Sequence, residues 1–193
     1  MGVRKATLAD KSWTIAVIAD AFRTNRSANW VVQSQDRIEG LIAYAFIRSF
    51  RSGGVLVHED GSCAALLLDP SGRNHVVRNA LEDLNLAFTT IGLSKVFRVL
   101  RRERYVKRFH PRTAFIHLWF IGVAPAEQGK GKGKELLLEI CRIADQRSLP
   151  IHLETSAPET LRFYANAGFA VYHEWQTEQM DFPLWFLKRE AQG

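Results

Sequence analysis

The chain has 193 residues, of which 47% are hydrophobic, and it contains 12 Phe and 5 Trp. This composition excludes an intrinsically disordered chain, and the length suits one domain spanning 1–193. The net charge of +6 is local, because residues 95–112 hold eight basic side chains and one acidic side chain, while the rest of the chain is nearly neutral. A general affinity for polyanions is therefore not expected.

The sequence carries no signal for a membrane or for export. No apolar run approaches the ~20 residues that a membrane-spanning helix needs, and the first segment, MGVRKATLADKSW, lacks the apolar stretch of a signal peptide. Cys63 and Cys141 stand far apart in apolar surroundings and are predicted to be buried, reduced thiols. We expect a cytoplasmic protein without membrane contacts.

The first third of the chain predicts two helices and three strands. Residues 2–7 predict a strand, and Asp10 is a suitable N-cap for a helix that runs to about residue 24. An apolar stripe in 36–50 predicts a second helix, which SGG ends. Two β-rich runs within 55–68 flank an Asp-Gly turn signal and predict a hairpin.

The remainder predicts further helices and strands that complete one α/β domain. After a loop at 69–73, we expect helices at 74–93 and 94–109, a strand at 114–123, a helix at 133–147, a strand at 150–156, a short helix at 158–167, and strands at 169–176 and 183–188. His110-Pro111 ends the second of these helices. The order predicts a mixed sheet with a helical insertion at about 74–110.

A glycine-rich segment, QGKGKGKE at 128–135, lies between an expected strand and an expected helix. Glycines let backbone amides approach an anion, and a helix N-terminus adds partial positive charge, so this placement favours a phosphate-binding loop. A nucleotide P-loop aligned on Gly133-Lys134 fails, because Gln128 and Glu135 replace its glycine and its hydroxyl. A dinucleotide fingerprint starting at Gly129 fails as well, because Lys134 replaces its third glycine. The alternative to a phosphate-binding loop is a flexible, lysine-rich turn that binds no ligand.

The pattern that fits is Gln128-x-x-Gly131-x-Gly133, preceded by Val123-x-Pro125 and followed by Leu136-Leu137. It resembles the acetyl-coenzyme A loop of the GNAT N-acetyltransferase superfamily. The block LETSAPETLRFYANAGFAVYHEW at 153–175 resembles the closing block of that superfamily, with Tyr164 and Gly168-Phe169 in matching positions. Ala157 stands where the family often has an asparagine. The two blocks cover 115–175, and the first half of the chain matches only in its order of elements.

The resemblance implies a GNAT-like domain, with a mixed, mostly antiparallel sheet splayed between its fourth and fifth strands, and acetyl-coenzyme A as co-substrate. An amide at Ile121, Gly122 or Val123 would polarise the thioester carbonyl, and Gly122 would suit a bulge in that strand. Ser156 would take over the contact of the missing asparagine. The pyrophosphate would be held by the amides of Gln128, Gly129, Lys130, Gly131, Lys132, Gly133 and Lys134, whose lysines add positive charge toward the 3′-phosphate.

Transfer of an acetyl group to an amine needs a base for the amine and an acid for the leaving thiolate. The resemblance makes Tyr164 the general acid, and a phenol is protonated at pH 7. His117 stands where histone-type members carry a catalytic glutamate, and Glu154 on the facing strand is the other candidate base. Water alone is a third candidate. The structural alternatives are a core tyrosine, a hydrogen-bonded strand histidine and an ion pair of Glu154. No metal is expected.

The acceptor is expected to be a small-molecule or protein amine, with Trp30 and Trp119 as candidate substrate-binding residues. The basic segment 95–112 is either a solvated helix face or a guide for an acidic acceptor. It matches no nucleic-acid-binding motif, so a nucleic-acid partner is not favoured. A monomer and a homodimer are both compatible with the sequence. The alternative function is a coenzyme A-binding or sensor protein with weak catalysis that docks on a polyanion through 95–112.

Overall fold

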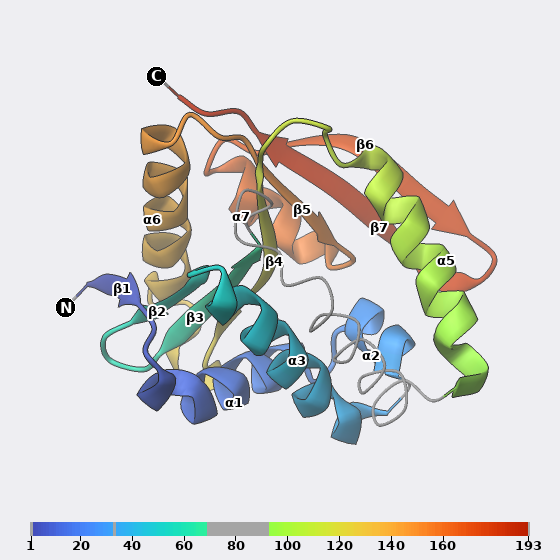
Figure 1. Ribbon diagram of the computed structural model, residues 1–193, viewed down its shortest axis with the longest axis horizontal. Helices are drawn as coiled ribbons and strands as arrows, with labels where there is room; N and C mark the ends of the chain where they lie inside the picture. The colour runs from blue at the N-terminus through green and yellow to red at the C-terminus, as the bar shows by residue number, and fades with distance from the viewer. Residues whose placement is uncertain (1, 33, 69–92, 193) are drawn as a thin grey trace.

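The computed structural model describes residues 2–32, 34–68 and 93–192 (Figure 1). The loop expected at 69–73 and nearly all of the helix expected at 74–93 lie outside these residues. The helices are α1 (Lys11–Phe22), α2 (Arg26–Val32), α3 (Ile38–Arg51), α5 (Leu93–Phe109), α6 (Lys132–Gln146) and α7 (Leu161–Ala165). The strands are β1 (Val3–Lys5), β2 (Val55–His58), β3 (Cys63–Leu68), β4 (Ile116–Val123), β5 (Ile151–Thr155), β6 (Ala170–Thr177) and β7 (Met180–Arg189).

The described strands form one mixed sheet of seven strands in the order β1-β2-β3-β4-β5-β7-β6. Every neighbouring pair is antiparallel except β4 and β5, which are parallel. This parallel pair is short, because only Ile116 with Ile151 and His117 with His152 are in register. Beyond these residues the two strands diverge, which confirms the predicted α/β fold with a sheet splayed between its fourth and fifth strands.

Two layers of helices bury the two faces of the sheet. Along β2, Val55 and Val57 pack with α1 and α3 on one face, whereas Leu56 packs with α6 on the other. This alternation follows from the two-residue period of a strand. Cys63 and Cys141 are buried free thiols, as predicted. Within the described ranges, no helix is both long enough and apolar enough to cross a membrane.

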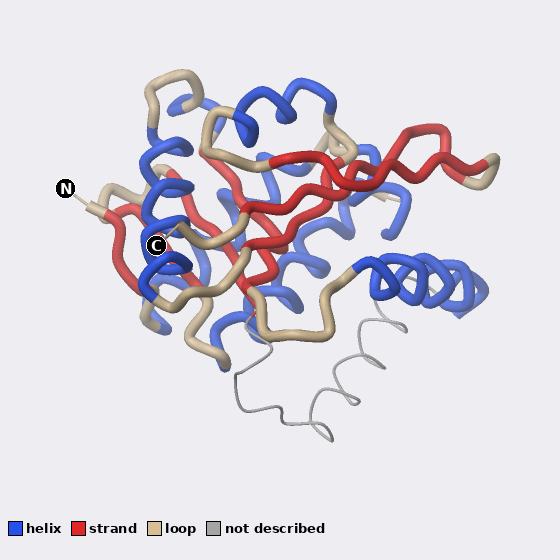
Figure 2. The backbone as a smooth tube through the Cα atoms, turned by 90° about the horizontal axis from the view of Figure 1, so that it is seen from above, coloured by secondary structure: helices blue, strands red, loops and turns tan. Residues whose placement is uncertain are grey.

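The basic helix α5 packs on the far end of the sheet rather than on its centre. Figure 2 shows it running alongside the β6–β7 hairpin, away from α6. Val106 contacts Leu184 and Phe186 in a small apolar cluster. Beside that cluster, the ring of Tyr105 stacks 3.9 Å from that of Trp175. The helix therefore has one apolar face that holds it to the body of the protein.

The structure corrects two local expectations. Helix α2 lies between the first two predicted helices, in a stretch for which the sequence predicted no element. The Asn25 side chain helps to begin it by accepting a hydrogen bond from the Ala28 amide at 2.9 Å. The irregularity in β4 lies at Trp119 and not at Gly122, because Leu66 pairs with Phe120 while Leu67 pairs with Leu118. Gly122 pairs regularly with Ala64.

Gly122 is needed for the packing of α1 and not for a bulge. A Cβ atom at this position would lie 3.0 Å from Ile18 Cα and 3.1 Å from Ala21 Cβ. Glycine therefore lets α1 lie directly against β4, and the packing of the helix sets the residue type.

Candidate active site

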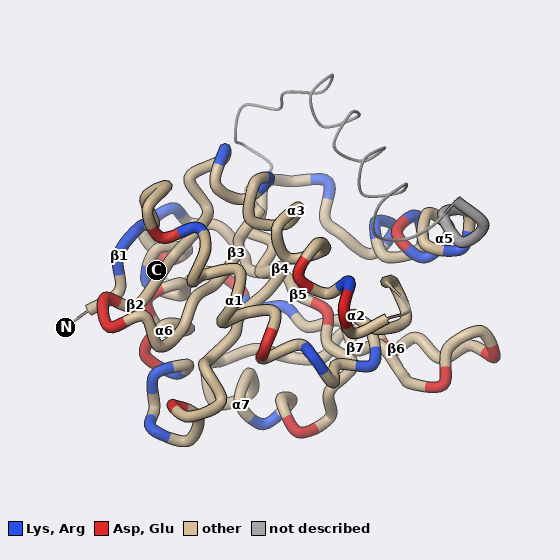
Figure 3. The backbone as a smooth tube through the Cα atoms, turned by 90° about the horizontal axis from the view of Figure 1, so that it is seen from below, with Lys and Arg blue, Asp and Glu red and all other residues tan. Residues whose placement is uncertain are grey.

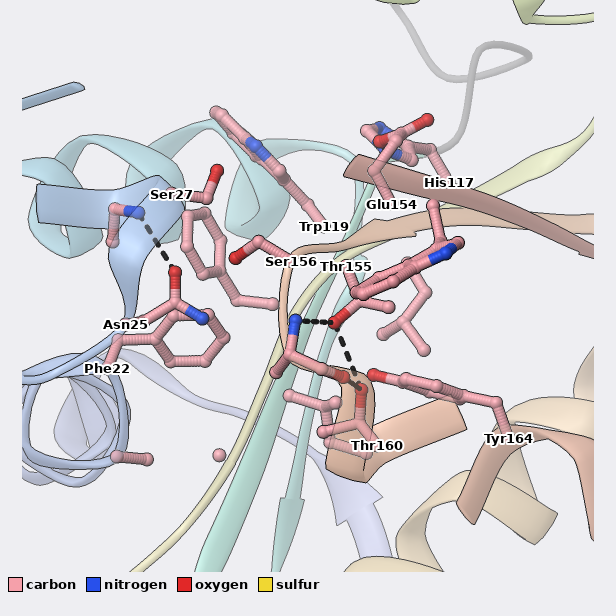
Figure 4. Close-up of a pocket in the computed structure, with 18 of the residues that line it drawn as sticks. Phe22, Asn25, Ser27, His117, Trp119, Glu154, Thr155, Ser156, Thr160 and Tyr164 are labelled. Carbon is pink, nitrogen blue, oxygen red and sulfur yellow. Dashed lines mark hydrogen bonds and ion pairs between the residues drawn. The ribbon is translucent and has the colours of Figure 1, made fainter. Parts of the chain in front are cut away.

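A cavity of about 1440 Å³ opens where β4 and β5 diverge. Its walls come from the loop between β4 and α6, from α1 to α3, from α5 and from the segment around α7. Figure 4 shows the side chains of His117, Glu154, Ser156 and Tyr164 around this space. Among the described strands, the divergence leaves one edge of β4 without a partner beyond His117, so the backbone of that edge is available to a ligand.

The glycine loop closes one end of the cavity at the N-terminus of α6. Gly129 and Gly131 have φ angles of 79° and 84°, which favour glycine because side chains with a Cβ atom rarely adopt them. Helix α6 then begins at Lys132 and runs for 15 residues, so its first amides and its dipole face this end. Of the predicted pyrophosphate-binding residues, all but Lys130 line the cavity.

The three lysines of the loop have different surroundings. Lys130 forms an ion pair with Glu127 at 2.9 Å. Lys132 forms an ion pair with Asp60, in the turn between β2 and β3, at 2.8 Å, and its hydrogen bond is the main reason why the pKa of Asp60 lies well below its usual range. Lys134 is exposed and lines the cavity. The Asp60 pair ties the loop to the hairpin and neutralises one of its charges.

His117 and Glu154, the two candidate bases, are in direct contact. Glu154 Oε2 lies 2.9 Å from His117 Nε2, and Glu154 Oε1 lies 2.8 Å from the Nε2 atom of His110, which follows α5. All three side chains are between 11% and 15% exposed. Two imidazoles from different parts of the chain thus share one carboxylate on the cavity wall.

The pKa values of Glu154 and His117 are shifted in opposite directions by their contact. Burial alone raises the pKa of Glu154, but His117 and His110 outweigh it and hold that pKa well below its usual range. Burial alone lowers the pKa of His117, but the charge and hydrogen bond of Glu154 outweigh it, so the pKa is raised. An imidazole made more basic in this way is a better proton acceptor.

His110 is a site residue that sequence reasoning missed, since the His-Pro pair indicated only the end of a helix. Among the described residues, His110, His117 and Glu154 are the group that could hold a metal ion, with donor atoms within 4.8 Å of one another. Hydrogen bonds between the imidazoles and the carboxylate account for this arrangement.

Tyr164 and Ser156 line the cavity near α7. Tyr164 is 7% exposed, and burial raises the pKa of its phenol, which therefore stays protonated. Ser156 Oγ is buried and has no hydrogen-bond partner among the described residues, so it can contact a ligand. Thr160 Oγ1 donates to the Ala157 carbonyl at 2.7 Å, which orders the segment between them.

The structure brings most of the other predicted site residues to the cavity. Ile121, Gly122, Val123 and Trp119 line it, but Trp30 does not. The indole of Trp30 donates to the Gln179 carbonyl at 3.0 Å, and the guanidinium of Arg98 lies 4.4 Å from its ring centroid.

Comparisons with known proteins agree with this fold and these motifs. The sequence model of the Acetyltransferase (GNAT) family matches residues 91–169. An uncharacterized N-acetyltransferase from Schizosaccharomyces pombe is 41% identical over 61 residues, which are 30% of this chain and 24% of that protein, so the match spans about a quarter of the relative's length.

Two solved structures cover the whole of this chain. One, of histone acetyltransferase HPA2 and related acetyltransferase from Corynebacterium glutamicum, has a TM-score of 0.71 at 18% identity, with 97% of that chain covered. The other, arylalkylamine N-acetyltransferase 2 from Aedes aegypti, has a TM-score of 0.63 at 14% identity and is fully covered. These likenesses establish the GNAT fold. The family model adds a match to GNAT acetyltransferases over residues 91–169, which is less than half of the chain.

Proposed function

We propose that the protein transfers the acetyl group of acetyl-coenzyme A directly to a primary amine within a ternary complex. The observation that carries this proposal is that a protonated phenol, a charge-supported imidazole and a glycine loop at a helix N-terminus all line one cavity. Acetyl transfer is the general reaction of the family that the chain matches.

In this proposal the cofactor enters between the loop and the free edge of β4. The first amides of α6 hold the pyrophosphate, because they have no partners within the helix. The pantetheine arm pairs with the free edge of β4, where an amide of Ile121, Gly122 or Val123 donates to the thioester oxygen. Ser156 Oγ supplies a further polar contact along this path.

In the proposed reaction, His117, whose pKa is raised, accepts a proton, and the protonated phenol of Tyr164 donates one. His117 takes a proton from the acceptor ammonium through Nδ1, the ring nitrogen that is not bonded to Glu154, directly or through water, and the free amine attacks the thioester carbonyl. A C–N bond forms, the C–S bond breaks, and the Tyr164 phenol gives its proton to the leaving thiolate. Glu154 stabilises the imidazolium, and His110 positions Glu154 by holding its second oxygen.

The test is the release of free thiol from acetyl-coenzyme A with a panel of primary amines. Tyr164→Phe should lower kcat by about 10²–10⁴-fold, which is the usual contribution of a general acid, while coenzyme A still binds. Tyr172→Phe is the matched control, since Tyr172 donates to the Phe109 carbonyl and does not line the cavity. Equal turnover in both variants would contradict the acid role.

The second candidate is a coenzyme A-binding protein with weak catalysis that docks on a polyanion. The exposed arginines of α5 favour it. Binding of coenzyme A without thiol release for any amine, together with salt-sensitive binding to a nucleic acid, would support this function in place of the first.

A further inference from the structure

The outer face of α5 carries a cationic stripe with no acidic residue. At 100° per residue, Phe97, Leu100, Arg101, Arg104, Lys107 and Arg108 fall within about 120° of one another around the helix. All six are exposed, Phe97 by 83% and Leu100 by 53%. Figure 3 shows basic residues gathered along this helix. We call these six residues the α5 stripe.

The acidic and apolar residues of the same helix point elsewhere. Glu103 lies outside the stripe and is paired with Arg102 at 2.8 Å. Val99 and Val106 are buried on the opposite side, where they pack on the protein. Among the described residues of α5, the four cations of the stripe therefore have no acidic residue on their own face, and packing of α5 does not account for them.

The stripe is continuous with the cavity. Leu100 and Lys107 belong both to the stripe and to the cavity wall, and Arg102 and Glu103 line the cavity from the same helix. A ligand that fills the cavity on this side and extends outward therefore passes along the stripe. A small amine held near His117 would leave the stripe unused.

We propose that the acceptor is the amine of an acidic polypeptide segment, whose carboxylates contact the α5 stripe while the amine enters the cavity. This inference rests on the proposed acetyl transfer. Arg101 and Arg108 are about 10 Å apart along the helix axis, at 1.5 Å per residue. Same-face side chains of an extended peptide repeat every ~6.8 Å, so two or three acidic residues span this distance.

A polypeptide fits the stripe better than a nucleic acid does. The apolar side chains of Phe97 and Leu100 sit among the cations, and an acidic peptide with apolar residues can contact both kinds. Single-stranded nucleic acids are bound by several aromatic rings along the groove, and the stripe holds one ring. Arginine suits carboxylates through paired hydrogen bonds.

The probes are two series of twelve-residue peptides with one primary amine each. One series has a free N-terminus and no lysine, and the other has a blocked N-terminus and one lysine. In each series the residues beyond the amine alternate Leu with Glu, with Gln or with Arg. We expect the Glu peptides to have at least about tenfold higher kcat/KM than the Gln peptides at low salt, through KM, with the preference shrinking as salt rises.

The test variant is Arg101→Glu, Arg104→Glu and Arg108→Glu together. It should lower the Glu-to-Gln ratio of kcat/KM by about tenfold or more. The control variant is Lys5→Glu, Arg37→Glu and Arg142→Glu, which makes the same change in net charge at exposed positions outside the stripe and the cavity. It should keep the ratio of the original protein. Thermal stabilisation by coenzyme A shows that both variants are folded.

The outcomes separate this inference from the proposed function. Thiol release from every peptide series at equal kcat/KM would overturn the acidic acceptor and leave acetyl transfer intact. The same is true if the stripe variant keeps the preference, or if the stripe binds single-stranded RNA and the peptides show no charge preference. No thiol release with any amine or peptide would overturn the proposed function itself.

Discussion

The contact between α1 and β4 at Gly122 allows a quantitative prediction for the variant Gly122→Ala. The new methyl group would lie 3.0 Å from Ile18 Cα and 3.1 Å from Ala21 Cβ, whereas carbon atoms pack best at about 3.5–4.0 Å. The helix must therefore move by roughly 0.5 Å, and Ile18 is fully buried in the core. Overpacking of this kind costs about 1–3 kcal/mol.

For a chain of this size, that cost corresponds to a fall in Tm of about 2–12 °C. Differential scanning calorimetry measures it, with urea unfolding as a second readout. Gly2→Ala makes the same chemical change where no atom lies within 4 Å and φ is not positive, so its Tm should stay within about 2 °C. Equal Tm values for the two variants would refute the close approach of α1 to β4.

Three further predictions concern charge. Glu154→Gln removes the charge that raises the pKa of His117, so the acidic limb of the kcat/KM profile should move to lower pH and kcat/KM at pH 7 should fall by about 10²–10⁴-fold; an unchanged profile would contradict the shared carboxylate. Asp10→Ala removes a buried carboxylate that Arg4 holds with two 2.8 Å hydrogen bonds, and should cost about 2–4 kcal/mol in urea unfolding. The Arg4 hydrogen bond is the main reason why the pKa of Asp10 is lowered, so the stabilisation is present above about pH 4 and should be lost in more acidic solution. Burial lowers the pKa of His152 to about 4, so between pH 6.5 and 4 only the unfolded chain takes up this proton; this histidine should reduce the free energy of unfolding by roughly 2 kcal/mol from pH 7 to pH 5, and His152→Phe should reduce that pH dependence.

The fold could be predicted where local signals are strong. The Asp-Gly turn fixed the expectation of the β2–β3 hairpin, and the apolar stripe of 36–50 marked α3 to within two residues. Helix α2 was missed because it is seven residues long and its N-terminal signal, Asn25, stands in a run of small polar residues. A short helix depends on packing more than on its own sequence.

The candidate site was predictable only where its residues lie within one motif. The glycine loop is such a motif, because its positive φ angles and its helix start are local properties. His110, His117 and Glu154 meet only after α5 has packed on β6 and β7 and β4 has paired with β5. Sequence reasoning named two of the three and treated them as rivals. It could not show that one carboxylate joins them.

Three other residues make contacts in the structure that differ from the roles expected from the sequence, because their partners lie far away along the chain. Trp30 was expected to bind the substrate, but Arg98 from a distant helix lies over its ring. Gly122 suggested a bulge, but its size reflects the approach of α1. Lys132 was expected to direct its charge toward a phosphate, yet it forms an ion pair with Asp60 of the β2–β3 hairpin. None of these partners is near in sequence.

The most direct test of the account is the thermal stability of the protein with acetyl-coenzyme A, coenzyme A and ATP in turn. A ligand at 100 times its Kd adds about 2.7 kcal/mol, which should raise Tm by about 5–11 °C for a chain of this length. We expect this rise for both coenzyme A forms and no rise for ATP at the same concentration. No rise with coenzyme A, or an equal rise with ATP, would contradict a coenzyme A site at the glycine loop.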